Sequence, residues 1–259
     1  MPAAREFGPG RQLNASDQAQ LKSWQLQPGL KAIERARLSA GSSNSSAVYR
    51  MVVDAIAERR DRTGTLIDVG CGRAALVPMV SRFCDRYVGV DIVRYEGFPE
   101  SAEFVSADFD ESRPIGLPDE IADTVVSIET IEHVENPRAF MRELARLAKP
   151  DGLLLVTTPN QLSWLSLATL LVKGQFNQFQ EAPGLYPAHI TSLLEIDLIR
   201  IARECGLVGA KIVYSNQGRL PFTGMHWPAV FRGRRFSDNL MLVARKSPMS
   251  RHGALAERQ

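Results

Sequence analysis

The segment Thr65–Ala75 constrains this chain more than any other. Its run Leu66–Val69 is mostly apolar, as is typical of a parallel strand buried on both faces, and it ends abruptly at Gly70 and Gly72. Glycine lets the backbone turn sharply and lets a ligand approach where a Cβ atom would collide with it. The apolar segment Ala74–Val80 follows and predicts a helix whose N-terminal amides point back into the turn. A strand, a glycine turn and a helix predict half of a nucleotide-binding unit.

The same turn also fits the dinucleotide-binding fingerprint, because Gly70, Gly72 and Ala75 have its spacing and Asp91 follows about twenty residues later. Asp68 separates the two interpretations. It precedes the first glycine, near the carboxyl end of the strand, where a carboxylate repels a pyrophosphate and attracts a ligand with an ammonium and a sulfonium group. We therefore expect a cationic ligand here, and an NAD(P)-dependent oxidoreductase is the alternative.

The sequence Asp68-Val69-Gly70-Cys71-Gly72 resembles the first motif of the class I S-adenosylmethionine-dependent methyltransferases. The resemblance implies an α/β fold with a doubly wound, mostly parallel seven-stranded sheet, Rossmann-like, whose last strand is antiparallel. It also implies that S-adenosylmethionine is the cofactor and that Asp68, Gly70, Cys71 and Gly72 hold it. A non-catalytic module that binds the cofactor is a second alternative.

Composition sets the class of protein. At 259 residues, with 44% hydrophobic and 23% charged residues, the chain is long enough for one large soluble α/β domain. A formal net charge of +2 is too small to indicate a nucleic-acid partner, so we expect none. Cys71, Cys84 and Cys205 are odd in number and lack metal-ligand spacing, which predicts a reducing, cytoplasmic location. We expect neither a signal peptide nor a membrane span.

The remaining strands and helices alternate, which predicts a parallel, doubly wound sheet. No helix is expected between the last two strands, so they should be antiparallel neighbours. The predicted strands are 65–69, 86–91, 103–109, 122–128, 153–157, 208–214 and 239–244, and the helices besides 74–80 are 47–60, 137–149 and 191–205.

Three parts of the chain are predicted. Residues 1–46 form an N-terminal extension, partly helical or disordered, residues 47–246 form the methyltransferase domain, and residues 247–259 form a flexible tail. The sequence leaves open whether the extension caps the active site or covers an edge of the sheet.

An insertion at about 159–187 interrupts the alternation and resembles a lid. Its apolar helix, 162–172, has three interpretations: a wall of the substrate pocket, a peripheral contact with a membrane surface, or plain core packing. Trp164 and Lys173 favour the membrane, whereas the lack of a basic polar face opposes it. The basic cluster Arg232, Arg234 and Arg235 could make a local basic spot, and its plain interpretation is a solvated loop.

Two acids end neighbouring strands at the edge where an open α/β sheet binds its ligand. Asp91 ends the second strand, where a carboxylate can accept both hydrogen bonds of a ribose diol, and Ile92 beside it should line the same site. Asp108 resembles the methyltransferase position at which an acid hydrogen-bonds the adenine amino group while its neighbour, here Phe109, packs on the ring. A turn aspartate is the alternative for each acid.

Glu129-Thr130-Ile131-Glu132-His133 follows the fourth strand at the same edge. If the backbone is helical there, Glu129, Glu132 and His133 fall at i, i+3 and i+4 on one face. Two carboxylates and an imidazole suit a divalent metal such as Mg²⁺. The run resembles that of the ubiquinone-biosynthesis O-methyltransferases, where a divalent metal is associated with it. Without a metal, Glu129 lines the rim of the cofactor pocket.

His133 and His189 are the candidate catalytic bases, since the pKa of imidazole lies near neutrality, and each also has a purely structural interpretation. Methyl transfer requires mainly that the protein hold the acceptor in line with the methyl group and exclude water. We expect O-methylation of a small or lipid-like hydroxylated acceptor, namely a polyphenol, a quinone precursor or a sugar. N- and C-methylation stay open, and the sequence does not indicate an oligomeric state.

Overall fold

The computed structural model describes residues 46–58, 63–110, 113–180, 189–221, 223–228 and 230–248. Nearly all of the predicted extension and tail, and part of the predicted insertion, lie outside the described residues. The expectations about those parts therefore stay predictions.

The described chain forms one seven-stranded sheet of order β3-β2-β1-β4-β5-β7-β6. Strands β1 to β5 pair in parallel, and β7 is antiparallel to both of its neighbours, β5 and β6. This arrangement confirms the predicted fold class. The strands are β1 (Thr63–Val69), β2 (Cys84–Asp91), β3 (Glu103–Ser106), β4 (Ala122–Ser127), β5 (Ala148–Pro159), β6 (Leu207–Tyr214) and β7 (Asn239–Lys246).

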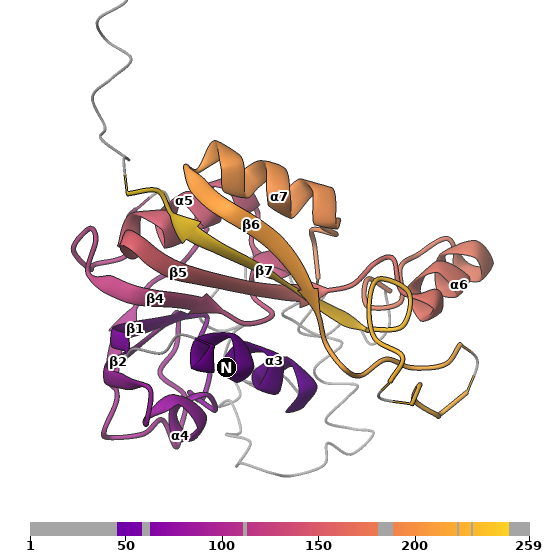
Figure 1. Ribbon diagram of the computed structural model, residues 1–259, viewed down its shortest axis with the longest axis horizontal. Coiled ribbons are helices and arrows are strands. Elements are labelled where there is room, and N and C mark those ends of the chain that lie inside the picture. Colours follow the sequence, from indigo (N-terminus) through magenta and orange to yellow (C-terminus); the bar gives the residue numbers. More distant parts are fainter. Residues whose placement is uncertain are drawn as a thin grey trace, which may run out of the picture.

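Helices cover both faces of the sheet (Figure 1). On one face lie α3 (Ser46–Ala57) and α4 (Val77–Val80), and on the other lie α5 (Pro137–Leu147) and α7 (Glu195–Glu204). Each face has its own hydrophobic cluster, because neighbouring residues of a strand point to opposite sides. In β1, Leu66 packs on the α3 side and Ile67 on the α5 side.

The helix α6 (Trp164–Lys173) stands apart from these two layers, beyond the carboxyl end of β5 (Figure 1). Ser163 begins it by accepting a hydrogen bond from the Ser166 amide (3.2 Å), and Gly174 ends it in the left-handed conformation. Among the described residues, no helix combines the length and the apolar character that a membrane crossing needs.

Several predicted helix boundaries are wrong. The helix 191–205 begins only at Glu195, and the helix 47–60 ends at Ala57. Only Val77–Val80 of the predicted helix 74–80 is helical, because Ala74 has a φ of 55° and the preceding residues form turns. The helix 137–149 ends at Leu147, and β5 begins directly after it. The helix N-terminus expected to point its amides into the glycine turn therefore does not follow the turn directly, because the helix begins only at Val77.

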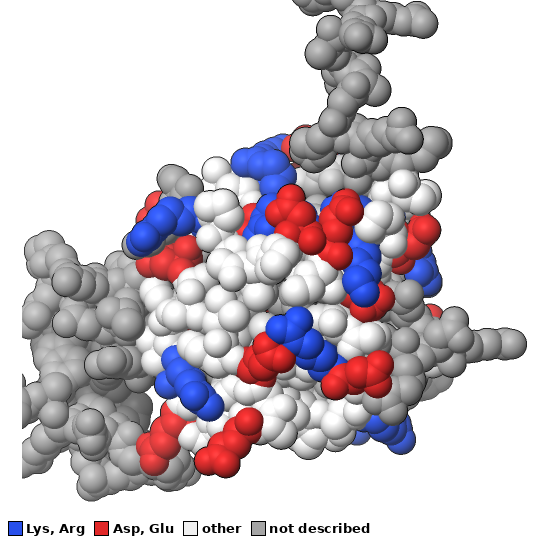
Figure 2. All heavy atoms as spheres, turned by 90° about the vertical axis from the view of Figure 1, so that its left-hand side faces the viewer, with Lys and Arg blue, Asp and Glu red and all other residues white. Residues whose placement is uncertain are grey.

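Figure 2 shows the end of the molecule where the parallel strands begin, on the left of Figure 1. Acidic and basic side chains lie next to one another on this face, without a large area of one sign. Ion pairs account for such mixing, among them Arg86 with Glu103 (2.6 Å) and Lys149 with Asp123 (2.8 Å). The glycine turn after β1 and the helix α6 lie toward the other end, where the parallel strands finish.

Candidate functional site

The turn after β1 has a backbone that only glycine suits. Gly70 has a φ of +81°, and a Cβ atom on it would overlap the side chain of Thr130. The amides of Gly70 and Cys71 both donate to the carbonyl oxygen of Val90 (2.8 and 3.1 Å), which fixes the turn against β2. The close packing of Thr130 therefore requires glycine at position 70, and the approach of a ligand to this turn stays a prediction.

Asp91 holds the same turn through its carboxylate. The Gly72 amide donates to Asp91 Oδ2 (2.8 Å) and the Ile92 amide donates to Asp91 Oδ1 (2.7 Å). Burial raises the pKa of Asp91, and these amide donors act in the opposite direction. Each carboxylate oxygen can accept a second hydrogen bond, so the arrangement is compatible with the predicted contact to a ribose.

Asp68 is nearly enclosed, with 3% of its surface exposed, and only one of its oxygens is satisfied. The hydroxyl of Tyr87 donates to Asp68 Oδ2 (2.5 Å), whereas Oδ1 is buried without a hydrogen-bond partner among the described residues. Burial raises the pKa of Asp68 to about 7, and the nearby Asp91 adds to the effect. An unsatisfied buried oxygen is rare and calls for a ligand, here one with a cationic or donor group. S-adenosylmethionine, which carries an ammonium group, fits this requirement.

Asp108 and Phe109 lie in the loop after β3, because that strand ends at Ser106 rather than at the predicted residue 109. The Asp110 amide donates to Asp108 Oδ1 (3.1 Å), which is the turn contact given above as the alternative for this acid. The ring of Phe109 packs edge-on against Phe140 of α5, with centroids 5.3 Å apart. Their adenine-binding role stays a prediction.

Glu129 has an unusual backbone, with a φ of 51°, and a carboxylate that turns toward β7. Its amide donates to Thr157 Oγ1 (3.0 Å), and the Asn239 side-chain amide donates to both carboxylate oxygens (3.2 and 3.1 Å). Burial raises the pKa of Glu129 to about 7. The single-turn 3₁₀-helix η1 (Ile131–His133) begins only after it, so the expected helical face shared by Glu129, Glu132 and His133 is wrong.

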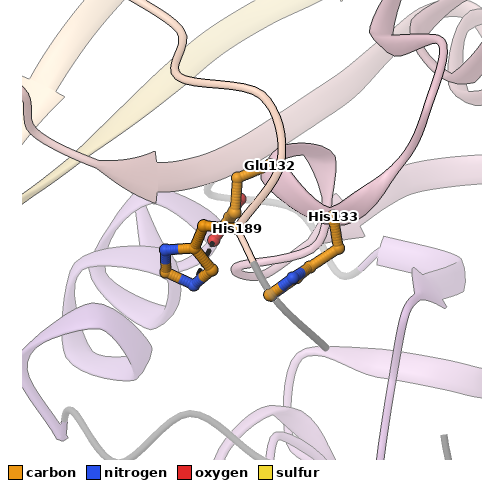
Figure 3. Close-up of side chains that lie close together, drawn as sticks. All are labelled: Glu132, His133 and His189. Carbon is orange, nitrogen blue, oxygen red and sulfur yellow. Dashed lines mark ion pairs between the residues drawn. The ribbon is translucent and has the colours of Figure 1, made fainter. Parts of the chain in front are cut away.

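The structure instead brings Glu132 and His133 together with His189 (Figure 3). One ligand atom from each of the three residues lies within 4.8 Å of the other two. Glu132 Oε1 is 4.0 Å from His189 Nε2, and the two imidazole rings meet edge to face with centroids 4.6 Å apart. The approach of His189 is fixed by the backbone, because the amides of Ile190 and Thr191 donate to the Glu132 carbonyl oxygen (2.9 and 3.0 Å).

Burial controls the charges in this cluster. Glu132 is fully buried, and the Thr158 hydroxyl donates to its Oε2 (3.0 Å), while Oε1 and His189 Nδ1 are buried without hydrogen-bond partners among the described residues. Burial, and then the charge of Glu129, holds the pKa of Glu132 well above its usual range. Burial, and then His133, lowers the pKa of His189 to about 4. At neutral pH His189 is therefore uncharged, whereas burial favours the protonated form of Glu132, so a bound cation would compete with a proton for its carboxylate.

Three residues that support the site were not identified from the sequence, namely Tyr87, Asn160 and Asn239. Tyr87 pairs in register with Leu66, two residues before Asp68, and Asn239 is the first residue of β7. Most of their partners are distant in the sequence, namely Asp68 for Tyr87, Arg234 and Ser237 for Asn160, and Glu129 for Asn239, so no local spacing could reveal them. The sequence signal for Asn160 and Asn239 is an asparagine at one end of an apolar strand, and the structure shows both side chains buried.

The sheet order and the glycine turn at its carboxyl edge define a Rossmann-like α/β protein with an antiparallel strand inserted near one edge. A family model described as "Methyltransferase domain" matches residues 43–210, which is more than half of the chain. The chain therefore belongs to the methyltransferase domain family.

Curated relatives include the ubiquinone biosynthesis O-methyltransferase of Rhodopseudomonas palustris strain BisA53. It is 26% identical over 155 residues, which cover 55% of this chain and 61% of the relative. The protein of the same name from strain HaA2 is 30% identical over 123 residues, covering 43% and 46% of the two chains. The chain thus spans less than two thirds of the length of these relatives.

Solved structures agree on the fold. A SAM-dependent methyltransferase from Archaeoglobus fulgidus aligns with a TM-score of 0.52 and 18% identity, covering 76% of this chain and 94% of the other. One from Aquifex aeolicus aligns with a TM-score of 0.51 and 13% identity, covering 88% and 97%. At such low identity the likeness concerns the fold alone.

Proposed function

We propose that this protein transfers a methyl group from S-adenosylmethionine to a hydroxyl group of a small or lipid-like acceptor. The observation that carries the proposal is Asp68 Oδ1, an unsatisfied buried oxygen beside a glycine turn, in a member of the methyltransferase domain family. An acid at this place attracts a cationic cofactor and repels the diphosphate of NAD, the alternative.

Each part of the cofactor has a counterpart at the carboxyl edge of the sheet. The turn at Gly70 and Gly72 admits the methionine portion, Asp68 pairs with its ammonium group, and Asp91 accepts the ribose hydroxyls. Asp108 and Phe109 are the candidates for the adenine end. The sulfonium of S-adenosylmethionine supplies an activated methyl group, so the protein has to align the acceptor and exclude water.

Transfer to oxygen is favoured by the cluster of Glu132, His133 and His189, which lies at the same edge of the sheet. A hydroxyl acceptor must lose its proton, and imidazole groups can take it up directly. Relatives named ubiquinone biosynthesis O-methyltransferases support the same assignment, since they match a large part of the chain. The acceptor class that we propose is a polyphenol, a quinone precursor or a sugar.

The same cluster would hold a divalent cation. One carboxylate and two imidazoles suit Zn²⁺ or Fe²⁺ better than Mg²⁺, which prefers oxygen ligands. Glu132 Oε1 and His189 Nδ1 are buried without hydrogen-bond partners among the described residues. The cation would supply a Lewis acid that lowers the pKa of the acceptor hydroxyl. Glu129, which the sequence placed in this set, bonds to Asn239 instead, so His189 takes its place in the proposal.

The function is tested in two steps. Calorimetry with S-adenosylmethionine and with NAD should show saturable binding of the former, strongly weakened in Asp68→Asn. Asp85→Asn is the matched control, because Asp85 is exposed at the opposite end of β2. Incubation with catechol, hydroquinone and sugar acceptors should then yield S-adenosylhomocysteine and a methyl ether, detected by mass spectrometry. NAD binding without S-adenosylmethionine binding would indicate an oxidoreductase, and cofactor binding without any product would indicate a non-catalytic module.

A further inference from the structure

Two segments at the carboxyl end of the sheet contain no acidic residue. Residues 160–180, which include α6, and residues 215–237, which connect β6 to β7, hold five basic residues and neither Asp nor Glu. The whole chain has a net charge of only +2, so the remainder of the protein is net acidic. Basic charge is therefore concentrated in these two segments, in contrast to the mixed charges of the face in Figure 2.

The same segments expose large apolar side chains. Leu171 is 87% exposed and Val230 is 81% exposed, so the protein itself covers little of either side chain. We call the exposed apolar residues of the two segments the apolar rim. It consists of Trp164, Leu171 and Val172 from α6 and of Met225, Val230 and Phe231 from the connection between β6 and β7.

The two segments form one surface. The Trp164 amide donates to the Arg235 carbonyl oxygen (2.8 Å), and the Arg235 guanidinium lies over the Trp164 ring, 5.4 Å from its centroid. The Asn160 side chain donates to the Arg234 carbonyl oxygen (2.8 Å). Figure 1 shows α6 and the connection next to each other at the right-hand end of the molecule.

Part of the basic charge on this surface lacks an ion pair. Arg219 is paired with Asp238 and Arg234 with Glu195, each at 2.6 Å. No ion pair involves Lys173, Arg232 or Arg235 within the described part of the chain. Lys173 donates to Gln180 Oε1 (2.7 Å), and the charge of Arg235 also acts on Glu195 at longer range. The surface therefore combines exposed apolar groups with an excess of positive charge.

We propose that the apolar rim docks on the surface of an anionic lipid bilayer. Apolar side chains that enter the headgroup region gain from burial, while the flanking cations remain at the level of the lipid phosphates. The basic face that α6 lacks by itself is supplied by the neighbouring connection, which removes the objection raised from the sequence. A nucleic acid would leave Leu171, Val172 and Val230 without a partner, and a second copy of the chain would bring like charges together.

Docking in this way would place the carboxyl edge of the sheet against the bilayer. If the proposed function holds, a lipid-like acceptor then reaches the site from the membrane without crossing water. Docking itself needs neither cofactor nor acceptor, so the two proposals fail independently.

Sedimentation with vesicles tests the docking. The full-length protein should bind vesicles of phosphatidylcholine mixed with phosphatidylglycerol and should not bind phosphatidylcholine alone, and added salt should weaken the binding. The double variant Leu171→Ser, Val172→Ser should bind at least about tenfold more weakly. Val208→Ser is its control, because Val208 is also an exposed valine but lies at the start of β6. Arg232→Gln should reduce the dependence on salt, whereas Arg82→Gln, at an exposed arginine just before β2, should not.

Circular dichroism of each variant verifies the fold before binding is compared. The tryptophan emission should shift to the blue on vesicles, and Trp164→Phe should reduce the shift, with Trp227 beside Phe231 contributing the rest. Absence of binding to anionic vesicles, or equal binding by the Leu171→Ser, Val172→Ser variant, would overturn the proposal. So would retention of a DNA or RNA duplex in place of vesicles, or a dimer in sedimentation velocity that these substitutions dissociate.

Discussion

The hydroxyl of Tyr87 donates to Asp68 Oδ2 across the β1–β2 pair, and Asp68 Oδ1 stays buried and unsatisfied within the described part of the chain. The hydrogen bond lowers the pKa of Asp68, whereas burial raises it, and the balance lies at about 7. Tyr87 thus adjusts the charge of the acid on which cofactor selection depends, although it occupies a different strand.

Tyr87→Phe should weaken S-adenosylmethionine binding at neutral pH. Without the donor, the pKa of Asp68 rises further above 7, so less of the carboxyl is ionised and the attraction to a cation falls. We expect a loss of about tenfold, as for a hydrogen bond to a charged group. Calorimetry over a range of pH should show the midpoint of binding moved to higher pH. Tyr214→Phe, which removes a similar contact with Glu195 far from the turn, should leave the midpoint unchanged.

Asp68→Asn should remove cofactor binding and yet stabilise the fold at alkaline pH. The folded pKa of about 7 lies above the ordinary value of 3.8, so the folded state binds the extra proton. Wild-type stability therefore falls as the pH rises from about 4 through 7, by up to about 4 kcal/mol, and this loss is absent from the variant. Thermal unfolding as a function of pH measures the difference. Parallel curves for wild type and Asp68→Asn would contradict the assigned burial of charge.

Gly70→Ala and Gly97→Ala separate backbone strain from steric overlap. Both glycines have a φ of +81°, but only the Cβ at position 70 would meet Thr130, and nothing lies within 4 Å of the Cβ at position 97. Gly97→Ala should therefore cost about 1–2 kcal/mol of unfolding free energy. Gly70→Ala should cost clearly more and should abolish binding of S-adenosylmethionine. Urea unfolding and calorimetry check the two effects, and equal costs would show that the turn can relax.

Divalent cation binding should depend on His189 and not on Glu129. Calorimetry with Mg²⁺ and Zn²⁺ should show affinity that is lost in His189→Ala and Glu132→Gln, because each removes a donor atom. Glu129→Gln should retain binding, since its carboxylate is engaged with Asn239. Loss in Glu129→Gln with retention in His189→Ala would restore the set predicted from the sequence. No binding by the wild type would leave His133 as a metal-free base.

Asn160→Ala should destabilise the protein although Asn160 touches no candidate catalytic group. Its side-chain amide donates to the carbonyl oxygens of Arg234 and Ser237 (both 2.8 Å), and its Oδ1 accepts from the Leu162 amide (3.0 Å). Truncation leaves these buried groups unsatisfied, at a cost of roughly 2–4 kcal/mol in total. Urea unfolding measures the loss. Asn216→Ala, at a partly exposed asparagine of the same connection, should stay close to wild type.

The sheet could be predicted from the sequence because its signal is local. The apolar runs that fill β1, β4 and β5 and the alternation with helices require only neighbouring residues to be compared. Asp68 could be chosen because electrostatics discriminates between ligands whatever the details of packing. The length of α4 could not be predicted, because it depends on the left-handed backbone of Ala74. Alanine rarely adopts this conformation, so the residue type did not indicate it.

The His189 contact with Glu132 had no local signal either. It arises because a loop far along the chain bonds its backbone amides to the Glu132 carbonyl oxygen. The spacing within Glu129–His133 predicted that Glu129, Glu132 and His133 share one helical face. The positive φ of Glu129 places it outside the short helix, so the three side chains do not share a face. Contacts that depend on one segment docking on another stay invisible until the tertiary structure is known.

The position of β7 bears on how the chain folds during synthesis. The strand fills the gap between β5 and β6, yet it is translated after both of them. Until Lys246 emerges from the ribosome, the side of β5 that later pairs with β7 has unpaired amides and carbonyls. These groups can pair with a strand from another nascent chain. Translation that stops short of this strand should therefore yield aggregates instead of a smaller folded domain.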